Sequence, residues 1–222
     1  LKLIGAHLLQ CDPADVDLRD NAVYGGDASI SVAEIARTAH IRQDLLPDGT
    51  DPTLEETAIY EPEVTSGVFS YSTHAAVVLV DPGTGEVEIE NYAVAEDCGT
   101  VVNPMIVDGQ IYGGVAQGIG TALFEEIPYD EYGQPLASTF ADYHWPGPTS
   151  LPAFRVAHML TPAEGTEYGM KGMGEGGAIA PPAAVANAIR DALLSGGIDA
   201  VVAETPITPR RLYTAIRAAN AS

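Results

Sequence analysis

The spacing of apolar residues in the first part of the chain predicts a helix, a hairpin and a second helix. The first residues, LKLIGAHLLQ, have apolar side chains at helical spacing. In VDLRDNAVYGG, Asp20 and Asn21 are typical of a tight turn between two strands. Ser31 and Glu34 have the spacing of a capping box, which predicts a helix from about Val32.

Residues 41–66 interrupt this pattern, and a longer hairpin follows them. The interval is rich in proline and acidic residues, and it predicts an extended, largely exposed connection. Two β-rich segments, GVFSYSTHAAVVLVD and EVEIENYAVAED, then flank a Pro-Gly turn. We therefore predict two regions. Residues 1–66 form part of a domain that continues from upstream sequence or from a partner chain, and residues 67–222 form a second domain.

A glycine-rich helix is predicted next. Asn103 is placed to cap it and Pro104 to begin it, and the apolar pattern continues for about 20 residues. Each glycine inside a helix costs about 1 kcal/mol relative to alanine, so the five glycines of this segment need an explanation. Gly114 and Gly118 share a face with Gln110. We expect a large group to approach the helix backbone on this face.

The remaining pattern predicts a strand in RVAHML, a helix from Pro182 that stops at Gly196-Gly197, and a final helix capped by Thr208 and Pro209. The fold class expected from these elements is α+β, with antiparallel strands and packed helices.

The composition excludes several classes of function. Ten basic and 31 acidic residues give a net charge of −21, which repels nucleic acid and anionic membranes. No segment has the roughly 20 consecutive apolar residues of a membrane span, and the cytoplasm is the expected location. Cys11 and Cys98 belong to no metal-binding motif, and His74, His144 and His158 are interpreted as structural. We predict no metal ligand on this chain.

The segment GMGEGG raises two alternatives. Gly172, Gly174 and Gly177 match the G-x-G-x-x-G pattern of dinucleotide-binding turns. No β-rich apolar strand precedes them, and the two prolines after Ala180 would interrupt the helix that such a turn requires. The glycines therefore predict an irregular loop before a proline-started helix. Its acid, Glu175, is either solvated on a surface loop or the charged group beside a space cleared for a large ligand.

Two segments together resemble one family of enzymes. EDCGTVVNPMIVDGQIYGGVAQGIGTALFEE and KGMGEGGAIAPPAAVANAIRDAL are similar to the C-terminal part of the molybdopterin-binding large subunit of the xanthine dehydrogenase, aldehyde oxidase and carbon monoxide dehydrogenase family. DYHWPGPTSLPAF and TPITPRRL fit as well, so the resemblance covers essentially the whole chain. It implies a molybdopterin-binding domain over residues 67–222.

The resemblance also implies roles for individual residues. Glu175 corresponds to the catalytic base beside molybdenum. It would take the proton of a metal-bound hydroxyl that attacks an electron-poor carbon, while hydride passes to a sulfido ligand. A raised pKa in a partly desolvated pocket would suit this role. Gln110 corresponds to a residue that binds the pterin. Gly172 and Gly174 are candidate cofactor contacts, and Asn103 is either a cofactor contact or only a helix cap. Lys171 is interpreted as orienting Glu175 or as solvated.

The implied cofactor is molybdopterin cytosine dinucleotide with molybdenum, shared with an N-terminal molybdopterin-binding partner chain. A [2Fe–2S] subunit and an FAD subunit would carry the electrons onward. The implied substrate is an aldehyde, a purine or an N-heterocycle. The alternatives are a fragment of a carbon monoxide dehydrogenase large subunit, and an inactive scaffold module of such a complex.

Overall fold

The computed structural model describes residues 1–61 and 67–221. The chain forms two compact units, Leu1–Glu61 and Pro62–Ser222, which are described separately below. The domain boundary predicted after residue 66 adjoins residues 62–66, which lie outside the described residues, and it stays a prediction.

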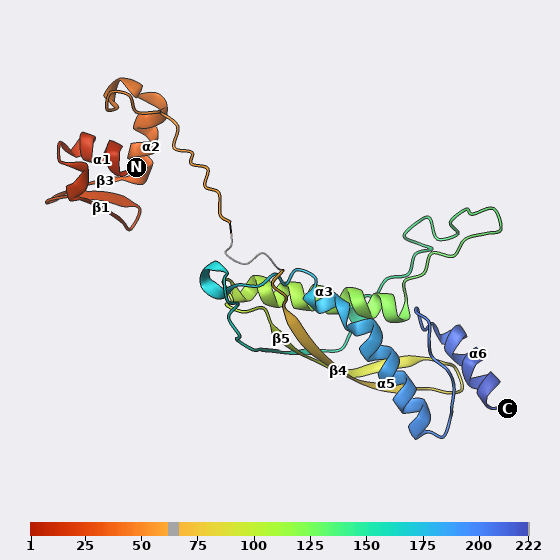
Figure 1. The fold of residues 1–222 in the computed structure, drawn as a ribbon. Coiled ribbons are helices and arrows are strands. Elements are labelled where there is room, and N and C mark those ends of the chain that lie inside the picture. The colour runs from red at the N-terminus through yellow and green to blue at the C-terminus, as the bar shows by residue number, and fades with distance from the viewer. Residues whose placement is uncertain (62–66, 222) are drawn as a thin grey trace. The chain divides into compact units, whose positions relative to one another are not determined.

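The first unit combines two helices with a small antiparallel sheet (Figure 1). Its elements are α1 (Lys2–Leu9), β1 (Val16–Arg19), β2 (Ala22–Gly25), β3 (Ala28–Ser31) and α2 (Val32–Ile41). The predicted turn is confirmed, because Asp20 and Asn21 both have positive φ between β1 and β2. The predicted helix start at Val32 is also confirmed, with Ser31 as its N-cap, since the Ser31 hydroxyl accepts a hydrogen bond from the Glu34 amide. The pattern did not predict β3.

The second unit is built on a three-stranded sheet. The predicted hairpin is confirmed as β4 (Tyr71–Val80) and β5 (Val87–Asp97), which pair antiparallel. The third strand, β6 (Phe154–His158), pairs with β5 in parallel, so the sheet order is β4-β5-β6. The expected α+β class is confirmed, with this one parallel pair in addition to the antiparallel strands.

Four α-helices complete the described part of the second unit: α3 (Pro104–Leu123), α4 (Gly176–Ile179), α5 (Pro181–Ser195) and α6 (Pro209–Ala219). The predicted Asn103 and Thr208 caps are both formed by side chains that accept backbone hydrogen bonds. Figure 1 shows α5 crossing the hairpin, and its contacts with β4 and α3 close the core. This core includes Tyr92 of β5, Ile111 of α3 and Ile189 of α5, none of which is exposed.

Within the described residues, no helix is both long enough and apolar enough to cross a membrane.

The glycines of α3 fall into two groups that the sequence could not separate. Gly114 and Gly118 lie against the segment of α4 and α5: a Cβ on Gly114 would come within 2.8 Å of the Ala178 nitrogen, and one on Gly118 within 2.7 Å of the Pro181 ring. At Gly109 and Gly113 a Cβ would meet none of the described residues within 4 Å. The expected close approach to the Gly114 and Gly118 face is therefore observed, but α4 and α5 of this chain make it, and the face is not open to a ligand.

This difference predicts opposite effects of adding a methyl group to α3. Gly118→Ala should destabilise the protein by about 1–3 kcal/mol, because the new methyl overlaps Pro181. Gly113→Ala, the matched control, should be neutral or stabilising by up to about 1 kcal/mol, because its Cβ is unobstructed and alanine favours the helix. Urea unfolding measures both changes. Equal destabilisation by the two substitutions would contradict this division of the glycines.

Candidate active site

The loop that carries Glu175 lies between β6 and α4 and is held by α3. The Gln110 side chain of α3 donates a hydrogen bond from Nε2 to the Gly174 carbonyl, with an N···O distance of 3.1 Å. The next residue, Glu175, stands at the start of α4 and has an exposed side chain. The structure thus brings together Gln110 and the loop that contains Gly172, Gly174 and Glu175, although 64 positions separate Gln110 from Gly174.

The predicted irregular loop is confirmed only in part. Residues 170–175 contain no helix, but a turn of helix, α4, begins at Gly176, inside the glycine motif. This turn requires two of the glycines for packing. A Cβ on Gly177 would come within 2.6 Å of the Ile111 carbonyl oxygen, and one on Gly176 within 2.7 Å of Oε1 of Glu96. A Cβ on Gly172 would meet nothing among the described residues within 4 Å.

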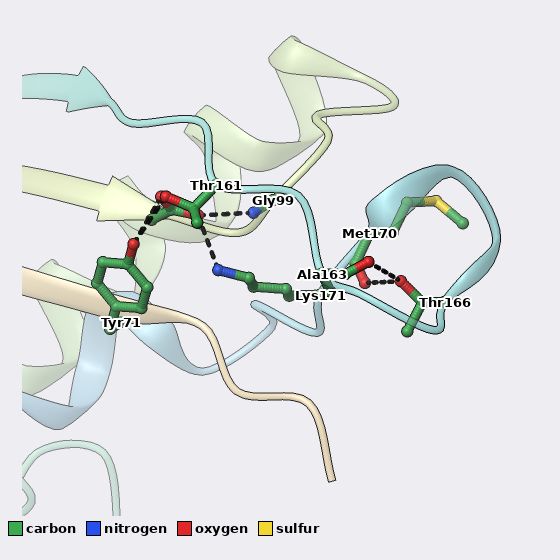
Figure 2. A network of polar contacts seen from close by, with 8 residues as sticks. Tyr71, Gly99, Thr161, Ala163, Thr166, Met170 and Lys171 are labelled. Carbon is green, nitrogen blue, oxygen red and sulfur yellow. Dashed lines mark hydrogen bonds and ion pairs between the residues drawn. The ribbon is translucent and has the colours of Figure 1, made fainter. Parts of the chain in front are cut away.

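A buried ion pair fixes the beginning of the loop (Figure 2). Lys171 Nζ lies 3.0 Å from Oδ1 of Asp97, the last residue of β5, and both side chains are almost completely buried. The Tyr71 hydroxyl donates a hydrogen bond to Oδ2 of Asp97 at 3.0 Å, and the Gly99 amide donates one to Oδ1 at 2.9 Å. Thr161 completes the network through the Tyr71 hydroxyl, at an O···O distance of 2.8 Å.

The network determines the charge of the Asp97 carboxyl. Burial by itself would raise the pKa of Asp97, but the hydrogen bonds from Thr161, the Gly99 amide, Lys171 and Tyr71 outweigh it and hold the pKa well below its usual range. Asp97 is therefore an anion at neutral pH, and Lys171 is its partner. The alternative of a solvated Lys171 is wrong, because its ammonium is buried against Asp97, and an effect of Lys171 on the orientation of Glu175 stays a prediction.

Backbone hydrogen bonds extend the same anchor. The Lys171 amide donates to the Cys98 carbonyl at 2.9 Å, and the Thr100 amide donates to the Gly169 carbonyl at 3.1 Å. Gly99 makes this approach feasible: its φ is +68°, and a Cβ there would come within 2.2 Å of the Gly169 oxygen. The end of β5 is thus bound to the start of the loop through both side chains and backbone.

The structure also shows the surroundings of the predicted helix cap, the histidines and Cys98. Asn103 Oδ1 accepts a hydrogen bond from the Ile106 amide, so its capping role is observed, and a cofactor contact stays a prediction. His74 bonds to Tyr92 and Ser72, and His158 bonds to Asp108 at 2.7 Å; their interpretation as structural residues stays a prediction. Burial raises the pKa of the Cys98 thiol. Among the described residues, no group of three or more His, Cys, Asp or Glu is placed to hold a metal ion.

Sequence reasoning missed Asp97, Tyr71, Thr161 and Glu96. The signal for Glu96 was present in the strand pattern. Tyr92, Val94 and Glu96 alternate along β5, and all three are buried on the same face of the sheet. The Asp97 network had no such signal, because its members are brought together from distant segments.

The exposed surface beside the loop suits a bulky, polar, flat ligand. Gly109 and Gly113 lie one turn apart on α3, and their unobstructed positions permit close approach to the helix backbone. Gln110 lies between them in the sequence and has an exposed side chain; its Nε2 is bonded to the Gly174 carbonyl, and its Oε1 is an additional acceptor. The residues present therefore fit a pterin-type group that contacts Gln110 and the open positions Gly109 and Gly113.

Comparison with known proteins identifies the class of this domain. The profile of the molybdopterin cofactor-binding domain matches residues 1–152, so the chain belongs to that family. The resemblance to the large subunits of molybdenum hydroxylases is thereby confirmed.

The chain is similar to several individual members of this family. The chain is 38% identical over 220 residues to the nicotine 6-hydroxylase large subunit of Paenarthrobacter nicotinovorans, covering 98% of this chain and 26% of the relative. It is 30% identical over 220 residues to the carbon monoxide dehydrogenase large chain of Hydrogenophaga pseudoflava, with the same coverage. Its fold matches quinoline 2-oxidoreductase of Pseudomonas putida 86 with a TM-score of 0.72 and 38% identity, over 97% of this chain and 27% of that one. The chain spans about a quarter of the length of these relatives.

The buried pair gives a prediction for stability. Asp97→Asn should destabilise the protein by about 3 kcal/mol at neutral pH, because it leaves the Lys171 ammonium buried without a counter-charge. The folded-state pKa of Asp97 is depressed, so its contribution is present above the ordinary carboxyl pKa and is lost as the pH falls below that value. The difference in the free energy of unfolding between Asp97→Asn and the wild type should therefore become smaller in acid. Unfolding curves at several pH values measure it.

The exposed Arg42–Asp44 pair provides the matched control. Asp44→Asn removes the same charge from a solvated ion pair, and little change in stability is expected. A similar loss for the two variants would show that burial of the Asp97 pair has no special importance.

Proposed function

We propose that this chain supplies the general base, Glu175, and part of the pterin-binding surface of a molybdenum hydroxylase. The observation that carries the proposal is the position of Glu175. Its carboxylate is exposed, while the loop beneath it is tied to β5 through Lys171 and to α3 through Gln110. A general base needs this combination of accessibility and fixed position.

Different residues of this chain would bind the cofactor and accept the proton. Gln110 would hold the pterin through the amide oxygen that the Gly174 bond leaves available, and Gly109 and Gly113 would admit it to the α3 backbone. Glu175 would accept a proton at a carboxylate oxygen as the substrate is oxidised. When bound, the molybdenum–pterin group would supply the redox centre. Because Glu175 is exposed on this chain, the desolvation that suits a base would come from the cofactor, the substrate and the rest of the enzyme.

The substrate class favoured by the comparisons is an aromatic N-heterocycle. The relatives named for nicotine and quinoline chemistry are each 38% identical to this chain, against 30% for the carbon monoxide dehydrogenase large chain. An electron-poor ring carbon next to nitrogen would be the position attacked. A carbon monoxide dehydrogenase fragment is the second candidate, and an inactive scaffold module is the third.

The relatives also support a multi-chain assembly. They are named as a large subunit, a large chain and a subunit gamma of a complex. We propose that this chain works with an N-terminal molybdopterin-binding segment or partner, a [2Fe–2S] subunit and an FAD subunit in the cytoplasm, and that the pterin is the cytosine dinucleotide form.

Replacement of Glu175 tests the proposed base. In the assembled enzyme, Glu175→Gln should lower kcat for quinoline or nicotine, with a dye as electron acceptor, by about 10²–10⁴-fold, because the amide cannot accept the proton. Molybdenum and pterin content should be unchanged. Glu164→Gln, an exposed acid in the preceding loop, is the matched control and should retain full activity.

Three outcomes separate the candidates. Activity of Glu175→Gln within about tenfold of the wild type would remove Glu175 as the base. A wild-type complex that contains neither molybdenum nor pterin would indicate the scaffold module. Oxidation of carbon monoxide, without oxidation of any N-heterocycle, would favour the second candidate.

A further inference from the structure

A second carboxyl group, that of Glu96, lies directly beneath the Glu175 loop. Glu96 is 1% exposed, and neither of its carboxyl oxygens has a hydrogen-bond partner among the described residues. The group is aimed at the start of α4. A Cβ placed on Gly176 would lie 2.7 Å from Oε1 of Glu96 and 3.2 Å from its Cδ, so the carboxyl occupies the space that the missing side chain leaves.

We propose that Glu96 is a positioning residue for Glu175: its carboxyl packs against Gly176, sets the start of α4 and thereby fixes the place of the exposed base. The proposal rests on the proposed function of Glu175. Gly176 is the residue directly after Glu175, so a displacement of the Gly176 backbone moves Glu175 as well. Glu96 does not itself touch the substrate or the cofactor.

The strand register explains why the carboxyl lies there. Glu96 is paired with Ser72 of β4 on one side and with His158 of β6 on the other, so its side chain emerges from the middle strand near the end of the sheet. Asp97, the next residue, points to the opposite face and binds Lys171. Two consecutive residues of β5 therefore hold the two ends of the loop, Lys171 and Gly176.

The contact with Gly176 favours the neutral form of Glu96. An ionised carboxylate without hydrogen bonds is costly to bury, whereas a neutral carboxyl packs against a glycine at much lower cost. Burial raises the pKa of Glu96. The Ser72 hydroxyl and His158 oppose this rise, and the Asp97 anion supports it. The Cys98 thiol also interacts with the Glu96 carboxyl, and His74 lies 3.1 Å from the Ser72 hydroxyl.

Ionisation of Glu96 should therefore disturb the base. The charged carboxylate interacts more favourably with water or further hydrogen-bond donors than with the backbone of Gly176, so the start of α4 should move away from it. This displacement lowers activity as the pH rises through the pKa of Glu96.

The pH dependence of the assembled enzyme tests this role. For wild type, kcat with quinoline or nicotine and a dye acceptor should fall on the alkaline side. In Glu96→Gln, which keeps the shape of the side chain but cannot ionise, kcat should stay level over the same range. Glu96→Ala should be at least about tenfold slower than Glu96→Gln, because the cavity releases α4 and misplaces Glu175. Glu88→Gln removes an exposed carboxyl from the same strand, and should keep the wild-type profile.

A second measurement does not depend on turnover. Hydrogen–deuterium exchange, corrected for the intrinsic effect of pH, should show that residues 174–179 lose protection as the pH rises in wild type and in Glu88→Gln. In Glu96→Gln the protection should not depend on pH.

The inference is overturned if Glu96→Gln and the wild type have parallel kcat profiles, or if the two proteins lose protection in the same way. This failure is distinguishable from failure of the proposed function. If Glu175→Gln is inactive and the pH dependence of kcat is the same in Glu96→Gln as in wild type, only the positioning role is rejected. Active Glu175→Gln would reject the base, whatever the Glu96 variants do.

Discussion

The ion pair between Asp97 and Lys171 is the interaction on which the position of the loop depends. The segment from Lys171 to Gly177 contains four glycines and has little intrinsic preference for one conformation. Burying two charges is costly, and such a pair often contributes little net stability compared with an apolar pair. Here the Tyr71 hydroxyl and the Gly99 amide donate hydrogen bonds to the carboxylate, and Thr161 bonds to the Tyr71 hydroxyl, so the pair links one end of the loop to one place on the sheet. Its contribution is to specificity of position more than to stability.

The glycines beside this anchor have two different physical functions, although they look alike in the sequence. Gly114, Gly118 and Gly177 permit helices of this chain to approach one another, and any side chain there would overlap backbone or a proline ring. Gly109, Gly113 and Gly172 leave their surroundings unobstructed. A ligand surface can be assigned only to the second group. Because α4 packs closely on the Gly114 and Gly118 face of α3, the part of α3 that a ligand can reach is the one with Gly109 and Gly113, which differs from the face predicted.

The secondary structure could be predicted where short-range rules dominate. Asn103, Thr208 and Ser31 marked helix starts through their own backbone hydrogen bonds, and alternation marked β4 and β5. The parallel pairing of β6 and the partner of Lys171 depend on contacts between residues far apart in the chain, which no local pattern contains. For the site, too, single residues could be predicted, but the contacts between distant segments could not. Glu175 and Gln110 were found through a family resemblance, and only the structure revealed the hydrogen bond that joins their segments.

Glu96 and Asp97 show how the pKa values of neighbouring carboxyls on one strand are shifted in opposite directions, upward for Glu96 and downward for Asp97. Both carboxyls are almost completely buried, so solvent does not distinguish them. Alternation along β5 sends Asp97 to the face where Tyr71 and Lys171 provide donors, and Glu96 to the face where α4 presents the Cα of Gly176. The anion on Asp97 in turn raises the free energy of a second charge one residue away. The ion pair of Asp97 at the start of the loop and the contact of Glu96 with Gly176 at its end are therefore physically coupled through a single peptide unit of the sheet.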